Sequence, residues 1–258
     1  MTRLDRRALF ASGAAAALLA ATGVSASPKR GGRLRAALSR ALFDQATNAT
    51  LYENLTEIGA DGTVRGELAT AWASENDARV WRFNLRKDVF FHDGTRFDTS
   101  QVRLPFALKK LGSHTLQITL DAPNPNLPYL LAHPGFELRT DDGIGTGMYQ
   151  VQKLEAGRHF IGVRVADHWK ALRAGWFDSV EFVQFSDSSI RAEALRDGMV
   201  DVADISQLDG YTDYCDYLPL PDGQTVTFIL SQAVSLPSNV GKAWPLDNLR
   251  MAERWWIA

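Results

Sequence analysis

The sequence contains one cysteine, Cys215, among its 258 residues. An internal disulfide and a cysteine-based metal cluster are therefore excluded. We interpret this lone cysteine as a small buried residue, with pairing to a second chain as the alternative. An excess of either charge is also absent, because 28 Lys and Arg residues stand against 30 Asp and Glu residues and leave a formal net charge of −2. This balance gives no reason to expect a nucleic-acid partner, which needs a basic face to neutralise phosphates.

Motifs of common enzymes are missing as well. The chain has no Gly-x-Ser-x-Gly elbow, no phosphate-binding loop and no zinc-protease helix. Residues 186–189 (SDSS) are typical of a turn followed by a helix N-cap rather than of a nucleophile with its base. His92 and Asp93 are interpreted as a turn, with a metal pair as the less favoured alternative, and His159 and His168 lack a matching carboxylate pattern. We therefore expect no catalytic residue, no metal site and no cofactor, and an enzyme is the least favoured class.

The first 26 residues have the features of an export signal rather than of a folded element. Positive residues at 1–7 precede an Ala-rich apolar run over about 8–21, and small residues follow up to Ala26. This order predicts a secretory signal cleaved after Ala26, because the apolar run is shorter than the ~20 residues that span a bilayer. Arg6 and Arg7 resemble a twin-arginine signal, with an ordinary Sec signal as the alternative. We expect the mature chain to be free in the periplasm.

The rest of the sequence mixes strand and helix patterns without a regular βαβ alternation. Alternation of apolar and polar residues predicts strands, and these lie at 32–38, 80–85, 115–120, 148–154, 160–165, 180–184, 200–205 and 225–230. Short helices are predicted at 50–55, 98–102 and 127–132, and a short apolar helix or turn at 67–73. An amphipathic helix that Gly198 ends is predicted at 188–197. This mixture argues for an α/β fold of the mixed, α+β kind.

Seven short stretches stand out in order along the chain. They are LYENL (51–55), GELATAW (66–72), VWRFNLRKDV (80–89), FHDGTRF (91–97), GTGMY (145–149), ALRDGMVD (194–201) and PLDNLRMA (245–252). Together they resemble the VYEGL, PxLAxSW, YTFKLRKGV, FHDGTPF, GTGPY, ALQSGEVD and PFDDVRVRQA segments of one family. This family comprises the dipeptide and oligopeptide solute-binding proteins of ABC transporters, family 5, which also holds nickel binders. Each stretch alone is a weak signal, but their common order makes the resemblance specific.

The resemblance implies a periplasmic binding protein-like fold of type II, with two lobes and a small domain. Residues 98–114 are fewer than the family usually places between its FHDGTPF segment and the following strand, so we expect a reduced small domain. The family also continues beyond the last residue of this sequence, so we expect the second large lobe to be missing. The expected domains are a signal at 1–26, a discontinuous lobe I at 27–50 and 140–258, and a small domain at 51–139.

The same resemblance implies a solute-binding component that takes up peptides or similar small solutes in the periplasm and passes them to the permease subunits of an ABC transporter. In this family the GTG segment lies near the domain crossover at the cleft, which makes Thr146 and Tyr149 candidate ligand-side residues. Phe43, Asp44 and Tyr52, which follow the first strand, are further candidates. Because such proteins close two lobes around a ligand, we expect weak or absent binding by a one-lobed monomer unless a partner supplies the second wall.

A second hypothesis stays open. A truncated relative that has lost solute capture would serve as a periplasmic protein-interaction module or have no function. Trp255 and Trp256 are adjacent near the last residue, and two such side chains are costly to leave in water. We interpret them as folding back onto the core or as a contact patch for a homodimer or a second-lobe partner.

Overall fold

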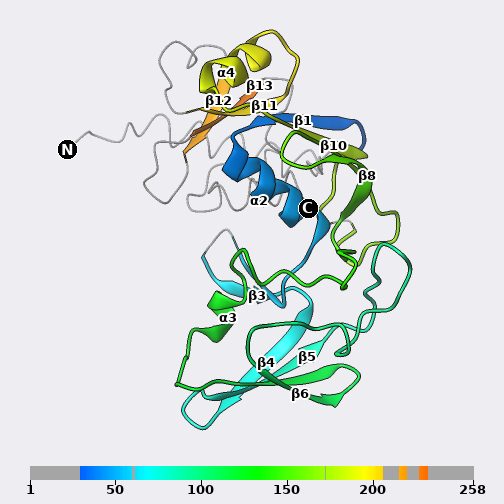
Figure 1. Cartoon of the computed structure of the whole chain (residues 1–258), viewed down its shortest axis with the longest axis vertical. Coiled ribbons are helices and arrows are strands. Elements are labelled where there is room, and N and C mark those ends of the chain that lie inside the picture. The colour runs from blue at the N-terminus through cyan, green and yellow to red at the C-terminus, as the bar shows by residue number, and fades with distance from the viewer. Residues whose placement is uncertain (1–29, 60–61, 172, 206–214, 220–226, 232–258) are drawn as a thin grey trace, which may run out of the picture.

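The computed structural model describes residues 30–59, 62–171, 173–205, 215–219 and 227–231. The predicted signal at 1–26 and the Trp255–Trp256 pair lie outside these residues. The described residues form a seven-stranded, a four-stranded and a two-stranded sheet. Figure 1 shows the seven-stranded sheet with its helices at the top and the two smaller sheets below it. We call these parts the large-sheet unit and the small-sheet unit.

The large-sheet unit is built on a mixed sheet. Its strands, in order across the sheet, are β12 (Cys215–Pro219), β13 (Thr227–Ser231), β11 (Val202–Ile205), β1 (Arg33–Leu38), β10 (Ser179–Gln184), β9 (His159–Arg164) and β8 (Tyr149–Glu155). The central strand β1 is parallel to both of its neighbours, β10 and β11. The outer strands pair antiparallel with the strands beside them. This mixture confirms the predicted fold class.

Two helices cover opposite faces of this sheet (Figure 1). Successive side chains of a strand point to opposite faces. Leu34, Ala36 and Leu38 of β1 therefore pack in one core cluster with α2 (Arg40–Leu51). Ala37 lies between them in the sequence and packs in a separate cluster with α4 (Ser188–Arg196). The sheet is thus the middle layer of three.

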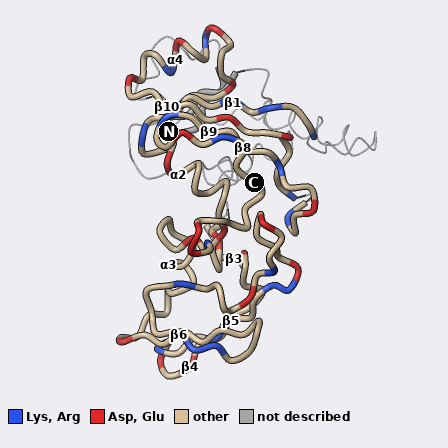
Figure 2. The backbone as a smooth tube through the Cα atoms, turned by 45° about the vertical axis from the view of Figure 1, so that its right-hand side comes forward, with Lys and Arg blue, Asp and Glu red and all other residues tan. Residues whose placement is uncertain are grey.

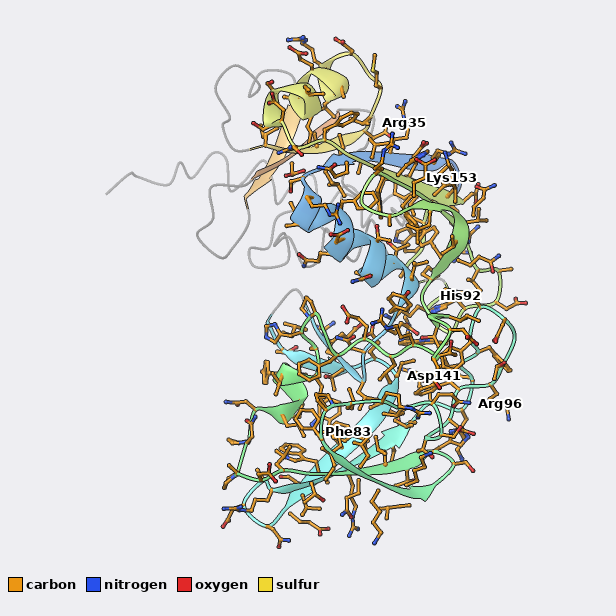
Figure 3. The ribbon with its side chains drawn as sticks, viewed as in Figure 1. Arg35, Phe83, His92, Arg96, Asp141 and Lys153 are labelled. Carbon is orange, nitrogen blue, oxygen red and sulfur yellow. The ribbon has the colours of Figure 1, made fainter. Side chains whose placement is uncertain are left out.

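The small-sheet unit uses the chain between α2 and β8. Its elements are β2 (Thr56–Ile58), β3 (Val64–Gly66), β4 (Ala69–Glu75), β5 (Val80–Leu85), β6 (Ala107–Gly112), β7 (Thr115–Thr119) and α3 (Leu127–Leu130). The larger of its two sheets is antiparallel, in the order β4-β5-β7-β6. Phe83, labelled in Figure 3, lies on the inner face of β5 with Leu116 and Ile118 of β7, and all three are fully buried.

Three predicted helices are wrong. The sequence predicts a short helix or turn at 67–73, but Ala69–Glu75 form strand β4. The small side chains of this stretch fit either structure, and pairing along β5 decides for the strand, with the Trp72 ring 6.3 Å from that of Phe83. The predicted helix at 98–102 is a turn, because the Asp98 carboxylate accepts a bond from the backbone N–H of Ser100 and so competes with helix formation.

The third wrong helix was placed at 50–55. The structure has its helix earlier, at Arg40–Leu51, and Tyr52 already has an extended backbone. Glu53 then forms a β-bridge with Leu138. The chain leaves the helix at this point because the following residues pair with the segment that returns to the large-sheet unit.

Most of the other predicted elements are confirmed. The strands predicted at 32–38, 80–85, 115–120, 148–154, 160–165, 180–184 and 200–205 correspond to β1, β5, β7, β8, β9, β10 and β11. The turn and N-cap predicted at 186–189 are also confirmed, because the Asp187 carboxylate accepts a bond of 2.8 Å from the backbone N–H of Ser189. Gly198 follows α4 with a φ of 69°, a conformation that glycine adopts without strain.

Charged residues of both signs are interspersed along the described backbone (Figure 2), which agrees with the near-neutral formal charge. None of the helices in the described parts of the chain is long and apolar enough to cross a membrane.

Candidate ligand-binding site

The carboxyl ends of the parallel strands β1, β10 and β11 meet at one edge of the large sheet. In open sheets with parallel strands, ligands bind at such an edge. Ser39 follows β1 here, and its backbone N–H donates to the Asp204 carboxylate of β11 at 2.6 Å. The Arg191 side chain of α4 donates to the Asp204 carbonyl oxygen at 2.7 Å and forms an ion pair of 3.2 Å with its carboxylate. Both side chains are buried, so they hold the strand ends in place.

The two candidate residues on α2 lie in different surroundings. Phe43 is fully buried in the core between α2 and the sheet. Asp44 is exposed and forms an ion pair of 2.8 Å with Arg40, one helical turn before it. An exposed pair of this kind is weak and opens easily, so the Asp44 carboxylate is available at the surface of the helix.

Tyr52 lies at the C-terminal end of the same helix. Its hydroxyl donates to the Gly143 carbonyl oxygen at 3.1 Å. The Arg139 guanidinium carbon lies 5.6 Å from the centre of the Tyr52 ring. The ring is partly exposed. Tyr52 and Arg139 therefore place an aromatic and a basic side chain side by side where α2 meets the returning chain.

The GTG segment packs against the last turn of α2. An added Cβ at Gly145 would lie 1.9 Å from the Leu51 carbonyl oxygen, and one at Gly147 would lie 2.4 Å from that of Thr50. Real Cβ atoms do not approach so closely, so both positions need glycine. The Gly147 N–H donates to the Leu51 carbonyl oxygen at 2.9 Å. The two glycines thus let one chain segment lie directly on the free carbonyl end of a helix.

Thr146 and Tyr149 are the remaining candidates, and both are buried. The Thr146 hydroxyl donates to the Glu53 carboxylate at 2.9 Å, and its carbonyl oxygen accepts a bond of 2.8 Å from His168. The Tyr149 hydroxyl donates to the Phe177 carbonyl oxygen at 3.1 Å, and burial raises its pKa. Of the five candidates, Asp44 and Tyr52 therefore reach the surface, while Phe43, Thr146 and Tyr149 lie behind it.

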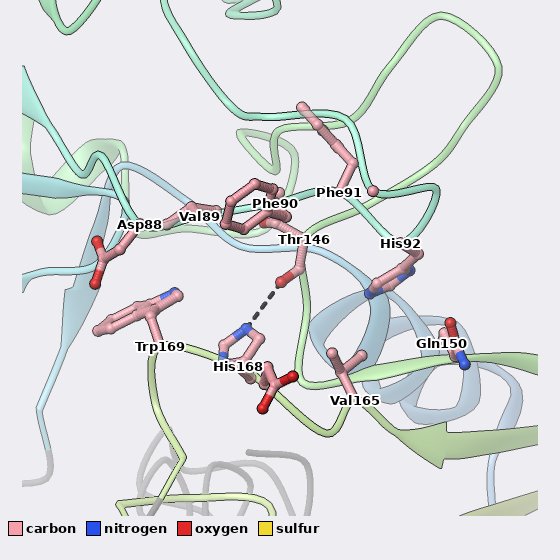
Figure 4. A pocket seen from close by; sticks show the side chains of 12 residues that line it. Asp88, Val89, Phe90, Phe91, His92, Thr146, Gln150, Val165, His168 and Trp169 are labelled. Atoms are coloured by element: carbon pink, nitrogen blue, oxygen red, sulfur yellow. Dashed lines mark hydrogen bonds between the residues drawn. The ribbon is translucent and has the colours of Figure 1, made fainter.

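A cavity of about 160 Å³ lies at the junction of the two units (Figure 4). It is lined by Asp88, Val89, Phe90, Phe91, His92, Gly94, Thr146, Gln150, Val165, Asp167, His168 and Trp169. The His92 imidazole donates to the Gly147 carbonyl oxygen at 2.8 Å, and burial, which disfavours the charged ring, is the main cause that lowers its pKa. The Asp93 carboxylate accepts a bond from the backbone N–H of Thr95 at 2.8 Å. Both side chains therefore hold backbone groups, as the turn interpretation predicts.

The part of the chain that the structure describes holds no group of three or more His, Cys, Asp or Glu side chains placed to bind a metal ion. His159 and His168, both considered as ligands from the sequence, each bind a protein group instead. His159 pairs with Glu181 at 2.8 Å, and His168 binds Thr146.

A buried group of polar side chains at this junction was not predicted from the sequence. Glu53 is its centre, and its carboxylate accepts bonds from Thr146 and, at 3.0 Å, from the Trp169 indole N–H. Lys170 lies 3.2 Å from the same carboxylate. Burial acts to raise the pKa of Glu53, but Lys170, His168 and Trp169 outweigh it and lower the pKa to about 2.

A signal for this group was present in the sequence. Glu53 and Glu67 lie inside the apolar stretches LYENL and GELATAW. A carboxylate in a buried stretch needs a partner, although the sequence does not say which cation supplies it.

The comparisons with known proteins identify the family. The sequence model of the bacterial extracellular solute-binding proteins, family 5 Middle, matches residues 63–106 and 102–216. The chain belongs to this family.

Curated members of the family are similar to part of the chain. The nickel-binding periplasmic protein of Escherichia coli (strain K12) is 28% identical over 186 residues, which cover 59% of this chain and 35% of that protein. The probable D,D-dipeptide-binding periplasmic protein DdpA of the same organism is 25% identical over 198 residues, which cover 61% and 38%. The chain therefore spans little more than a third of the length of these relatives.

Solved structures show the fold. AgaA of A. tumefaciens R10 in complex with agropinic acid matches with a TM-score of 0.66 and 22% identity, covering 72% of this chain and 48% of that one. The periplasmic binding protein DppA of Helicobacter pylori in complex with the peptide STSA matches with a TM-score of 0.63 and 18% identity, covering 74% and 51%. The described residues thus have the fold of a periplasmic binding protein.

Proposed function

We propose that this protein is the solute-binding component of a peptide-type ABC transporter and binds peptides or similar small solutes. The family match between residues 63 and 216 carries this proposal. The name of DdpA, a dipeptide binder, and the peptide bound to the H. pylori protein support peptides as the solute class. On this proposal the protein is a binding protein and not an enzyme.

The proposed ligand wall consists of α2 and the chain that follows it. Asp44 and Tyr52 contact the solute, since their side chains reach the surface. A carboxylate at Asp44 suits the ammonium group of a peptide, and the Tyr52 ring supplies apolar contact area. Phe43, Thr146 and Tyr149 support this wall from behind, because each is buried against it.

We also propose where the protein acts and to which membrane proteins it passes its solute. The chain is exported to the periplasm by a twin-arginine signal that is cleaved after Ala26, and it delivers its solute to permease subunits. The names of both curated relatives, which are periplasmic proteins, support this location. Trp255 and Trp256, which lie outside the described residues, are proposed as a contact patch for a second copy or another partner.

Calorimetric titration tests the solute class. Pools of dipeptides, tripeptides and tetrapeptides are titrated into the purified chain, and Ni²⁺ alone is titrated in parallel because one relative is named for nickel. Saturable heat with peptides supports the proposal. Binding of Ni²⁺ without peptide binding would replace peptides by a metal as the solute, and silence in every titration would favour a protein-interaction module.

Paired variants test the wall. Tyr52→Ala is expected to weaken peptide binding about tenfold, or about 1.4 kcal/mol, because an aromatic contact is lost. Tyr129→Ala is its matched control, since Tyr129 is 41% exposed on α3 in the small-sheet unit. Asp44→Asn is expected to weaken binding by a similar factor, and its control is Asp197→Asn, an exposed aspartate that pairs with Arg196. Equal effects of variant and control would remove these residues from the wall.

A further inference from the structure

Three carboxylates converge on a single ammonium group at the junction of the two units. Lys170 lies in the loop after β9 of the large-sheet unit, and its Nζ contacts Glu67, lies 3.2 Å from Glu53 and lies 3.4 Å from Glu57. We call these four residues the Lys170 hub. The three glutamates come from the chain between α2 and β4, which leads into the small-sheet unit. The hub therefore joins segments that are more than 100 positions apart in the sequence, as the 103-residue separation of Lys170 and Glu67 shows.

The hub is enclosed by protein. The Lys170 side chain is 12% exposed and that of Glu53 is 3% exposed. Charges this far from water are stabilised by their partners rather than by solvent, so removing one partner leaves the others with an uncompensated cost. Exposed ion pairs of the large-sheet unit, such as Arg40 with Asp44, can lose a partner with little loss of stability, because water solvates the remaining charge.

A second set of contacts runs beside the hub. Arg86, just after β5 of the small-sheet unit, lies with its guanidinium carbon 3.7 Å from the centre of the Trp169 ring. The Arg86 Nε also donates to the Glu67 carbonyl oxygen at 2.6 Å. Trp169 and Lys170 are thus held on the small-sheet unit by neighbouring contacts. The loop after β9 therefore connects the two units.

The hub is connected directly to the proposed ligand wall. Glu53 follows Tyr52 in the chain, and its carboxylate accepts the Thr146 hydroxyl between the two glycines that pack on the end of α2. The Glu53 carbonyl oxygen accepts the Leu138 N–H at 2.8 Å. Glu53 is therefore bonded to the returning chain and directly follows Tyr52 of the proposed ligand wall.

We propose that Lys170 is the positioning residue of this junction. By holding Glu53, Glu57 and Glu67 together, Lys170 fixes the position of the small-sheet unit, and of Tyr52 in the proposed ligand wall, relative to the large sheet. Lys170 acts through Glu53 and does not contact the solute. The effect of Lys170 on solute binding rests on the proposed function, whereas its effect on the geometry of the junction does not. An ammonium group suits this role, because it offers three donors in separate directions, while a guanidinium group is planar.

Amide hydrogen exchange tests the positioning without any ligand. In Lys170→Met at pH 7.5, the amides of Gly147, Leu138 and Leu68 are expected to exchange about tenfold faster or more. Their N–H groups bond to the carbonyl oxygens of Leu51, Glu53 and Asn54, the chain that carries the hub's central carboxylate. The amides of β1 and β10 are expected to keep their protection. Unchanged exchange at the three junction amides, or an equal increase throughout the chain, would overturn the proposal.

A matched variant controls for the loss of a lysine. Lys153, labelled in Figure 3, lies on β8 of the large-sheet unit. Its side chain is 46% exposed and pairs with Glu155 at 2.9 Å. Lys153→Met is expected to leave the junction amides unchanged. If Lys170→Met does not fold, Glu67→Gln serves instead, since it keeps the side-chain size and leaves Lys170 with Glu53 and Glu57. It is expected to speed exchange most at the Asn54 amide, which donates to Glu67, and equal protection there in both proteins would count against the hub.

The pH dependence separates positioning from general damage. Without Lys170, the three glutamates face Arg86, His168 and Arg65, which lies opposite Glu57 in the β2–β3 register. Without the ammonium group the three carboxylates repel one another, which favours their protonation as the pH falls. The junction amides of Lys170→Met are therefore expected to regain protection between pH 7.5 and 5. Peptide affinity, about tenfold weaker at pH 7.5, is expected to recover in parallel. If wild type binds no peptide, the proposed function fails while the exchange data still decide the positioning role.

Discussion

The Thr146 hydroxyl donates a hydrogen bond of 2.9 Å to the Glu53 carboxylate across 93 positions of sequence. This bond joins the chain segment that leaves the large-sheet unit to the segment that returns to it. Both groups are buried, so the bond forms away from water, where an unpaired partner is expensive.

Gly145→Ala is expected to destabilise the protein by several kcal/mol, because its Cβ would lie 1.9 Å from the Leu51 carbonyl oxygen and the backbone must move. Urea unfolding measures the change. Gly112→Ala is the control, since an added Cβ there meets nothing within 4 Å, and it is expected to change stability by less than about 1 kcal/mol. Similar losses in both variants would contradict the close packing of the GTG segment on α2.

Stability is expected to fall in acid as Glu53 takes up a proton. Its pKa is lowered from an ordinary 4.5 to about 2 in the folded chain. The stabilisation is therefore complete above pH 4.5 and is lost as the pH falls through about 2, by on the order of 3 kcal/mol. Urea unfolding between pH 6 and 2 measures this loss. Glu53→Gln, which does not titrate, is expected to show a shallower fall, and a curve parallel to that of wild type would refute the assignment.

Asp187→Ala is expected to cost about 1 kcal/mol, because the N-cap bond to the Ser189 N–H is removed from the first turn of α4. Thermal unfolding measures the change. Ser186→Ala, one residue earlier and exposed, is expected to stay within about 0.5 kcal/mol of wild type. An equal midpoint for Asp187→Ala and Ser186→Ala would show that the cap contributes nothing.

Phe83→Ala is expected to cost about 3–5 kcal/mol, because Phe83 is fully buried between Trp72 and Trp81 and leaves a cavity in the small-sheet unit. Phe90→Ala is the control, because Phe90 is 48% exposed, and it is expected to cost less than about 1 kcal/mol. Denaturant unfolding followed by tryptophan fluorescence reports on both. A loss for Phe83→Ala no greater than that of the control would place Phe83 outside the core.

The sequence by itself determined most of the strands, the cap and end of α4, and the family. Strand β5 was predictable because a half-buried strand forces Trp81, Phe83 and Leu85 to alternate with polar residues. The resemblance was predictable because short runs such as FHDGTRF are local in the sequence. It also named the GTG segment, whose glycines the structure explains by their contact with α2.

Tertiary structure alone decided the rest. Residues 69–75 have no strong preference between helix and strand, and pairing with β5 made them a strand. The partner of Glu53 was likewise undetermined, because Lys170 is brought to it by the packing of two units and by no local pattern. Local preferences are encoded within a few residues, whereas a buried charge is satisfied by whichever distant group the completed fold places beside it.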